Sequence, residues 1–207
     1  YKTMFIAWKQ RERGEQDFTE CEKKTSLLNE YPGSPSLTIL SFRNSFHGRT
    51  LGTLSTTRSK PIHKLDFPAF DWPSVEFPKY KYPLKDYERE NAQEDYCCLE
   101  QVEDAMDKYK RMDKNVAAIV VEPILSEGGD LEASPDFFRN LQKIAKNNCA
   151  FLCFDEVQTG CGATGKWWAH EHFDLPDPPH CVTFSKKMVT GGFYHTVEMM
   201  PKLPYRI

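Results

Sequence analysis

Two charged residues follow apolar runs in a way that suggests chemistry. Asp155 comes directly after Ala150–Phe154, and Lys186 comes just after Cys181–Phe184. Each run has the length and composition of a buried strand, and such strands often deliver a functional side chain at their carboxyl end. A lysine and an aspartate delivered this way suit pyridoxal phosphate, because the lysine forms a Schiff base and the carboxylate keeps the pyridine nitrogen protonated. The two positions therefore predict a site for this cofactor.

Both residues have a structural alternative. Adjacent lysines such as Lys186 and Lys187 are usually a solvated charge pair, but these two interrupt an apolar stretch. A lysine near cationic or desolvating groups has a lowered pKa and becomes a better nucleophile. Asp155 alone could cap a helix or form a core ion pair, since a buried carboxylate needs a partner. Its occurrence with Lys186, Glu122 and a glycine-rich continuation favours the cofactor.

Four segments carry a resemblance to a known family, the class III pyridoxal-phosphate aminotransferases. In chain order they are Ser45–Thr50, Val121–Gly129, Asp155–Gly160 and Thr183–Met188. Three more are similar to the branch of this class that acts on 4-aminobutyrate: Phe70–Pro73, Trp168–His172 and Pro204–Ile207. The resemblance extends over residues 1–207. Because members of the class are longer, we expect the chain to be the central part of their cofactor-binding large domain, with amino-terminal and carboxyl-terminal parts lying outside it.

The resemblance implies the α/β fold of fold type I pyridoxal-phosphate-dependent transferases, a mostly parallel sheet with helices on both faces. The residue pattern agrees. Val116–Val121 reads as a buried strand, Ser134 and Pro135 start a helix, and Ala150–Phe154 reads as the next strand. Such a unit predicts parallel neighbours, with Glu122 and Asp155 on the same edge of the sheet.

The rest of the chain is predicted from local patterns. Tyr1, Met4, Phe5 and Trp8 have the spacing of an amphipathic helix, and apolar positions in 99–109 have it again. The polar residues 21–36 read as a connecting segment before a strand at 37–42. Residues 60–90 carry five prolines among aromatic residues, so an ordered irregular segment is expected there rather than a long helix or a central strand.

The family pattern also implies roles for the cofactor-binding residues. Lys186 is the lysine that follows the small residue Ser185, which makes it the Schiff-base lysine rather than Lys187. Phe46 and Val157 would pack on the two faces of the cofactor ring, and the amide of Gln158 would reach its phenolic oxygen. His47 resembles the family's active-site histidine. All of these except Lys186 could also be ordinary core or structural residues.

On the substrate side, Arg49 lies in a glycine-containing turn, where a guanidinium can clamp a carboxylate through two hydrogen bonds. A surface arginine is the alternative. The resemblance assigns Arg49 to the carboxylate of an ω-amino acid. It makes Glu127 the switch glutamate that neutralises a second arginine, which is expected beyond Ile207, and it groups Glu122 with these substrate-binding residues. The family's phosphate-binding residues are expected before Tyr1.

The resemblance implies an enzyme that transfers the amino group of 4-aminobutyrate to 2-oxoglutarate by a ping-pong route. Its partners would be small amino acids and 2-oxo acids, and the full-length form would be a homodimer in the mitochondrial matrix. Another ω-amino acid such as β-alanine is an alternative substrate. A catalytically inactive fragment is the alternative from outside the enzyme class.

Composition excludes several other functions. The net charge of −3 comes from 27 basic and 30 acidic residues spread along the chain, so neither nucleic acid nor an anionic membrane is an expected partner. No apolar run is long enough for a membrane span. His170 and His172 lack the spacing of metal ligands, and no metal is expected. The seven cysteines, without a CxxC motif, are expected to be reduced thiols.

Overall fold

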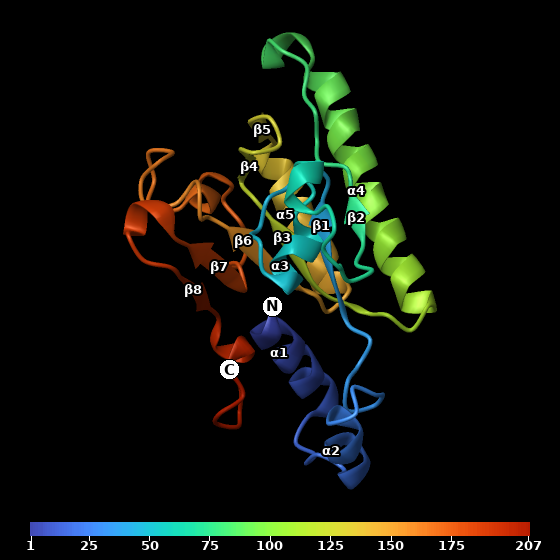
Figure 1. Ribbon diagram of the computed structural model, residues 1–207. Helices are drawn as coiled ribbons and strands as arrows, with labels where there is room; N and C mark the ends of the chain where they lie inside the picture. Colours follow the sequence, from blue (N-terminus) through green and yellow to red (C-terminus); the bar gives the residue numbers. More distant parts are fainter.

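The computed structural model describes residues 1–207 and is organised around one six-stranded sheet (Figure 1). The order is β2-β1-β3-β6-β7-β8. Neighbouring strands are parallel, except that β8 runs antiparallel to β7. Their bounds are Thr38–Phe42 for β1, Ser74–Val75 for β2, Val116–Val121 for β3, Phe151–Asp155 for β6, Cys181–Phe184 for β7 and Gly192–His195 for β8. The predicted α/β class with a mostly parallel sheet is confirmed.

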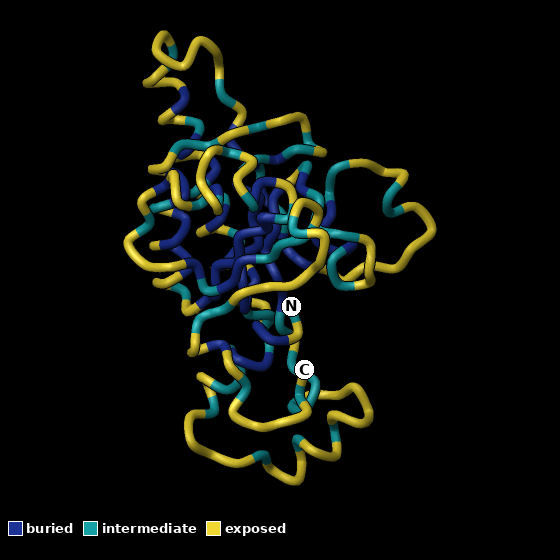
Figure 2. The backbone as a smooth tube through the Cα atoms, turned by 90° about the vertical axis from the view of Figure 1, so that its left-hand side faces the viewer, coloured by how far each residue is buried: buried dark blue, intermediate teal, exposed yellow.

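The central strands are buried on both faces, which explains their nearly continuous apolar runs. Along β3, Ile119 and Val121 belong to one core cluster, whereas Ala118 and Val120 belong to a second. The same alternation divides β6. Figure 2 shows the buried segments gathered in the middle of the molecule and the exposed ones around them. The sheet is therefore the middle layer of the molecule.

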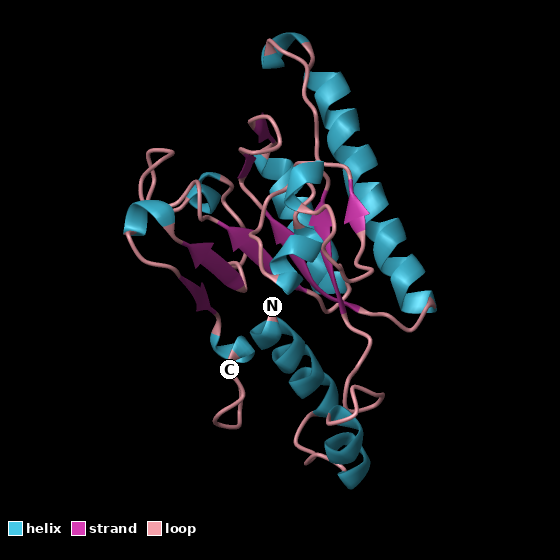
Figure 3. Ribbon diagram, in the orientation of Figure 1, coloured by secondary structure: helices cyan, strands magenta, loops and turns pink.

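Helices cover both faces of this sheet, as predicted (Figure 3). Helices α4 (Glu88–Arg111) and α5 (Pro135–Asn147) contribute to the larger core cluster, and α1 (Lys2–Arg13) contributes Met4 and Ala7 to the smaller one. The predicted cap of α5 is present, because the Ser134 hydroxyl accepts a hydrogen bond from the Phe137 N–H. No helix is both long and apolar enough to cross a membrane.

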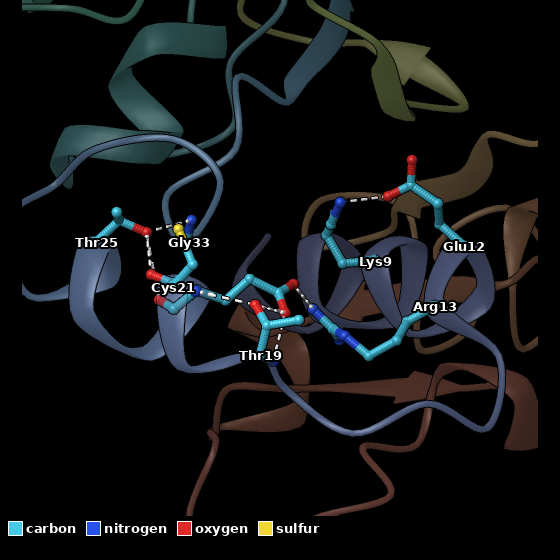
Figure 4. A network of polar contacts seen from close by, with 8 residues as sticks. Lys9, Glu12, Arg13, Thr19, Cys21, Thr25 and Gly33 are labelled. Carbon is cyan, nitrogen blue, oxygen red and sulfur yellow. Dashed lines mark hydrogen bonds and ion pairs between the residues drawn. The ribbon is translucent and has the colours of Figure 1, made fainter.

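One expectation for the amino-terminal part was wrong. Residues 20–26 form helix α2 (Glu20–Ser26) instead of part of a connecting segment. Its start is fixed by a capping box of Thr19 and Glu22, and Arg13 pairs with Glu22 at 2.8 Å (Figure 4). The helix buries none of its residues. It therefore has no apolar stripe for a periodicity argument to detect.

The proline-rich stretch is irregular and ordered, as expected. Apart from the start of α4, it holds edge strand β2 and the single 3-10 turns Pro61–His63 and Leu84–Asp86. Two of its aromatic residues are buried, with Trp72 packing against Tyr1 and Phe77 against Phe42. The remaining short elements are helix α3 (Leu51–Thr56), the hairpin of β4 (Ile124–Leu125) and β5 (Leu131–Glu132), and 3-10 turns at Ala169–His172, Lys186–Met188 and Val197–Met199.

Candidate active site

The predicted residues lie at the carboxyl edge of the sheet because the strands that carry them are parallel. Asp155 ends β6, and Glu122 follows β3 directly. Lys186 comes two residues after β7, and the loop after β1 carries Phe46 and His47. One sheet edge thus receives functional side chains from four neighbouring strands, which is where ligands bind in open α/β sheets.

Asp155 is a buried carboxylate with three bonds inside the protein. Its Oδ1 accepts from the Thr183 hydroxyl at 2.9 Å and from the Val157 N–H at 3.2 Å, while Oδ2 lies 2.8 Å from His47 Nδ1. Burial opposes ionisation, but the hydrogen bond and charge of His47, together with Thr183 and Val157, leave the pKa of Asp155 lowered. Since each carboxylate oxygen accepts two hydrogen bonds, Oδ2 keeps one acceptor position.

His47 is held by Asp155 at one nitrogen only. Its side chain is 1% exposed, and its Nε2 is buried without a hydrogen-bond partner. Buried polar atoms in folded proteins nearly always have a hydrogen-bond partner. His47 Nε2 can therefore still bond a ligand of the site.

The two adjacent lysines have different surroundings. The Lys186 ammonium group donates a hydrogen bond to the Gln158 side-chain oxygen, and its charge acts on both Glu122 and Glu127. Both lysines are exposed, but only Lys186 makes a side-chain hydrogen bond. The backbone of Lys186 is also unusual, because its φ of 44° lies in the left-handed region. Long side chains adopt this region at a cost, and such strain concentrates at functional sites.

Glu122 supports the loop that carries Phe46. It is 6% exposed, and its Oε1 accepts the Phe46 N–H at 2.8 Å. Burial raises the pKa of Glu122 to about 7, partly offset by the charge of His47 and the Phe46 N–H. The rings of Phe46 and His63 meet edge to face, with 5.2 Å between their centroids. Glu122 is thus placed to fix an aromatic side chain of the site.

Two charged residues expected on the substrate side have different environments. Arg49 is exposed, lies 5.8 Å from the centroid of the Phe46 ring and has no ion-pair partner. Glu127 pairs with Lys60 at 2.7 Å, which lowers the pKa of Glu127. The following Gly128 is required by close packing, because a Cβ there would lie 2.4 Å from the Asn44 carbonyl oxygen. Because Arg49 has no ion-pair partner, its guanidinium is free to hold an anion.

The structure adds partners that sequence reasoning missed. They are Thr183, which bonds Asp155, Lys60, which pairs with Glu127, His63, which contacts Phe46, and Glu156, which contacts His170. Thr183 is the register partner of Asp155 on β7, so a hydroxyl residue near the end of an apolar strand was its only signal. The contacts of Lys60 and His63 with the site depend on how the irregular loop folds back, which local patterns do not encode.

His170 and His172, whose spacing argued against a metal site, both contact protein groups. His170 Nδ1 lies 2.9 Å from Glu156, and His172 Nε2 lies 3.0 Å from the carbonyl oxygen of Thr164. No group of three or more His, Cys, Asp or Glu side chains in residues 1–207 could hold a metal ion.

The residues present fit pyridoxal phosphate. The vacant acceptor position on Asp155 matches a pyridinium N–H, and a bond of this kind between charged groups is strong. Lys186 offers a primary amine and Phe46 an aromatic face. A site with these donors can bind an aromatic aldehyde cofactor and hold a carboxylate substrate at Arg49.

The sequence model of the class III aminotransferases matches residues 2–207, so the chain belongs to this family. It is 56% identical over 207 residues to the mitochondrial 4-aminobutyrate aminotransferase of Homo sapiens and 52% identical over 206 residues to the 4-aminobutyrate aminotransferase of Dictyostelium discoideum. Both matches cover all of this chain but only 41% of the relative. A solved lysine aminotransferase from M. tuberculosis matches with a TM-score of 0.79 and 30% identity, covering 100% of this chain and 44% of that one.

Proposed function

We propose that the protein containing this chain transfers the amino group of 4-aminobutyrate to 2-oxoglutarate, using pyridoxal phosphate attached to Lys186. The names of the relatives support the reaction. The observation that carries the proposal is Asp155, which is buried, held by three hydrogen bonds and left with one acceptor position on Oδ2. An ionised carboxylate kept in this state, at the sheet edge that also carries Lys186, suits the protonated nitrogen of this cofactor.

Each residue of the site has a task in this proposal. The cofactor, when bound, supplies an electron sink that stabilises negative charge on the substrate carbon. Asp155 keeps the cofactor nitrogen protonated, and His47 with Thr183 keeps Asp155 ionised and oriented. Lys186 Nζ moves the proton at the reacting carbon. Phe46 and Val157 pack against the ring, and Gln158 bonds a polar group at its edge.

Arg49 is proposed to bind the substrate carboxylate. Its lack of an internal ion pair supports this role, because a guanidinium without a partner can form two parallel hydrogen bonds with a carboxylate. Glu127 pairs with Lys60, and the charges of His63 and Lys186 also help to lower its pKa, so Glu127 can neutralise positive charge near Lys186. An exposed pair of this kind is weak and can exchange partners when a second cation or a substrate carboxylate arrives.

We further propose that the full-length protein is a mitochondrial homodimer. The name of the human relative supports the compartment. Apolar residues that are more than half exposed follow Lys186, which supports a subunit contact near the site. They are Val189, Tyr194, Val197, Met200, Tyr205 and Ile207.

The function is tested by assaying a full-length protein that carries these residues. We expect glutamate to form from 2-oxoglutarate when 4-aminobutyrate is the donor, with a higher kcat/KM than with β-alanine or lysine. A higher kcat/KM with β-alanine or lysine would change the substrate assignment. No glutamate with any amine donor, in a protein saturated with pyridoxal phosphate, would contradict the proposal.

A further inference from the structure

Glu156, the neighbour of Asp155, is a second buried carboxylate at the same sheet edge. Its residue is 1% exposed, and the side chain is fully buried. Burying an ionised carboxylate costs several kcal/mol unless it is paired and hydrogen-bonded, so its surroundings have to be built for it.

Its two oxygens accept four hydrogen bonds. Oε1 accepts from the His170 N–H at 2.8 Å and lies 2.9 Å from His170 Nδ1. Oε2 accepts from the Thr159 hydroxyl at 2.6 Å and from the Ala169 N–H at 2.9 Å. Every acceptor position of the carboxylate is therefore used. These bonds outweigh burial, so the pKa of Glu156 is lowered.

The donors come from both ends of one loop, residues 157–170. Thr159 lies near its start, whereas Ala169 and His170 lie at its end, so the carboxylate closes the loop on itself. The Gly160 N–H adds a bond to the Glu156 carbonyl at 2.9 Å. Gly160 also lies under Trp168, where a Cβ would come within 2.8 Å of the indole ring. The start of the loop is thus packed tightly against its end.

The same residue ties the loop to the strand that leads to Lys186. The Glu156 N–H donates to the Thr183 carbonyl on β7 at 3.0 Å. On the other side, Gln158 accepts a hydrogen bond from Lys186. Asp155 has none of the donors of Glu156, because its own partners are His47, Thr183 and Val157. The two neighbouring carboxylates therefore hold different parts of the site.

We propose that Glu156 is a positioning residue for the cofactor site, holding Val157 and Gln158 in place by clamping the loop 157–170. This inference rests on the proposed function, since it gives those two residues a ligand to contact. Asp155 would touch the cofactor itself, whereas Glu156 would act only through its neighbours. A substitution at Glu156 should consequently loosen one wall of the site, while Asp155 keeps its contacts with His47 and Thr183.

Glu156→Gln tests this inference, because the amide turns one oxygen into a donor facing two other donors. Asp95→Asn is the matched control: Asp95 is also buried and is bonded by Tyr80 and Ser134, but in the groove between α4 and α5. Hydrogen exchange followed by mass spectrometry measures how often the backbone of residues 157–170 opens. Equilibrium binding of pyridoxal phosphate to the full-length protein measures the affinity of the site for the cofactor. Absorption of the bound cofactor gives a third readout that a loss of stability alone would not move.

For Glu156→Gln we expect exchange in 157–170 to rise about tenfold, cofactor affinity to fall about tenfold and the absorption maximum to shift. Thr159→Ala removes one donor only, and it should give a smaller change of the same kind if Glu156→Gln does not fold. Asp95→Asn should raise exchange in α4 and α5 and leave cofactor affinity unchanged.

Two results would overturn the inference, and only the second would also overturn the proposed function. Wild-type protein that binds the cofactor, with Glu156→Gln and Thr159→Ala variants that bind it equally well and with the same spectrum, would overturn this inference alone. Wild-type protein that binds no pyridoxal phosphate would overturn the proposed function and the inference together.

Discussion

At the residue scale, His47 helps to keep the buried carboxylate of Asp155 ionised. The imidazole and the Thr183 hydroxyl hold the carboxylate, and the low pKa that results keeps it ionised where burial alone would neutralise it. The sequence predicted Asp155 as an anchor because it ends a buried strand. It did not predict Thr183, since that partner depends on the register of β6 and β7.

The first prediction concerns Asp155→Asn in the full-length protein. The amide oxygen can keep the bonds from Thr183 and Val157, and its NH2 group can face a neutral His47, so folding and cofactor binding should persist. A neutral amide cannot hold the cofactor nitrogen protonated, and transamination should fall by at least a hundredfold, about 3 kcal/mol. The exposed Asp136→Asn is the control. Activity of Asp155→Asn within threefold of wild type, about 0.7 kcal/mol, would contradict the role.

The second prediction concerns the pH dependence of stability through Glu122. Its folded-state pKa of about 7 is above its unfolded value, so the folded state binds the proton more tightly. Stability should therefore be lost as pH rises from the unfolded pKa of 4.5 through about 7, by up to roughly 3 kcal/mol. Glu122→Gln keeps the acceptor for Phe46 and removes this loss.

Urea denaturation at pH 5 and pH 8 measures the second prediction. The free energy of unfolding should depend less on pH in Glu122→Gln than in wild type. The exposed Glu132→Gln in β5 should keep the wild-type dependence. Equal pH dependence in both variants would show that Glu122 titrates normally in the folded protein.

At the scale of the element, losing an N-cap should lower the free energy of unfolding more for a helix that packs in the core than for one that buries nothing. Ser134 caps α5 and also bonds the buried Asp95 at 2.6 Å. Ser134→Ala should therefore lower the free energy of unfolding by about 2 kcal/mol. Thr19→Ala removes the cap of α2, which buries nothing, and should cost about 1 kcal/mol or less. Urea denaturation of both variants checks this order, and a larger loss for Thr19→Ala would reverse the interpretation.

Some helices and strands were predictable from sequence patterns, and others were not. Strands β3 and β6 and the start of α5 were predictable, because continuous apolar runs and a Ser-Pro cap are strong local signals. Helix α2 was missed, although its capping box is visible in the sequence, because it has no buried face. Lys60 and Glu127 lie 67 positions apart, and only the folded loop brings them together. The positions of Asp155 and Lys186 at strand ends were thus readable from the sequence, but the partners of these two side chains were not.

At the scale of the whole molecule, the chain presents the carboxyl edge of one sheet, which we propose to be part of a larger enzyme. It spans 41% of the length of its human relative, and the phosphate-binding residues and second substrate arginine are expected outside it. Expressed as these 207 residues, the protein should bind pyridoxal phosphate weakly and should not transaminate, because backbone N–H groups at a helix N-terminus normally anchor the phosphate. Equilibrium dialysis checks this. Tight stoichiometric binding with turnover of 4-aminobutyrate would show that residues 1–207 already contain a complete site.

The central claim is that this fold presents Lys186 to the cofactor, and the most direct test is to locate the attached group. A full-length protein carrying these residues would be loaded with pyridoxal phosphate, reduced with borohydride, digested and mapped by mass spectrometry. Because Lys186 contacts Gln158 and Lys187 makes no side-chain hydrogen bond, we predict the pyridoxyl group on Lys186 alone. A label on Lys187, or a label spread over exposed lysines with none at Lys186, would contradict the claim.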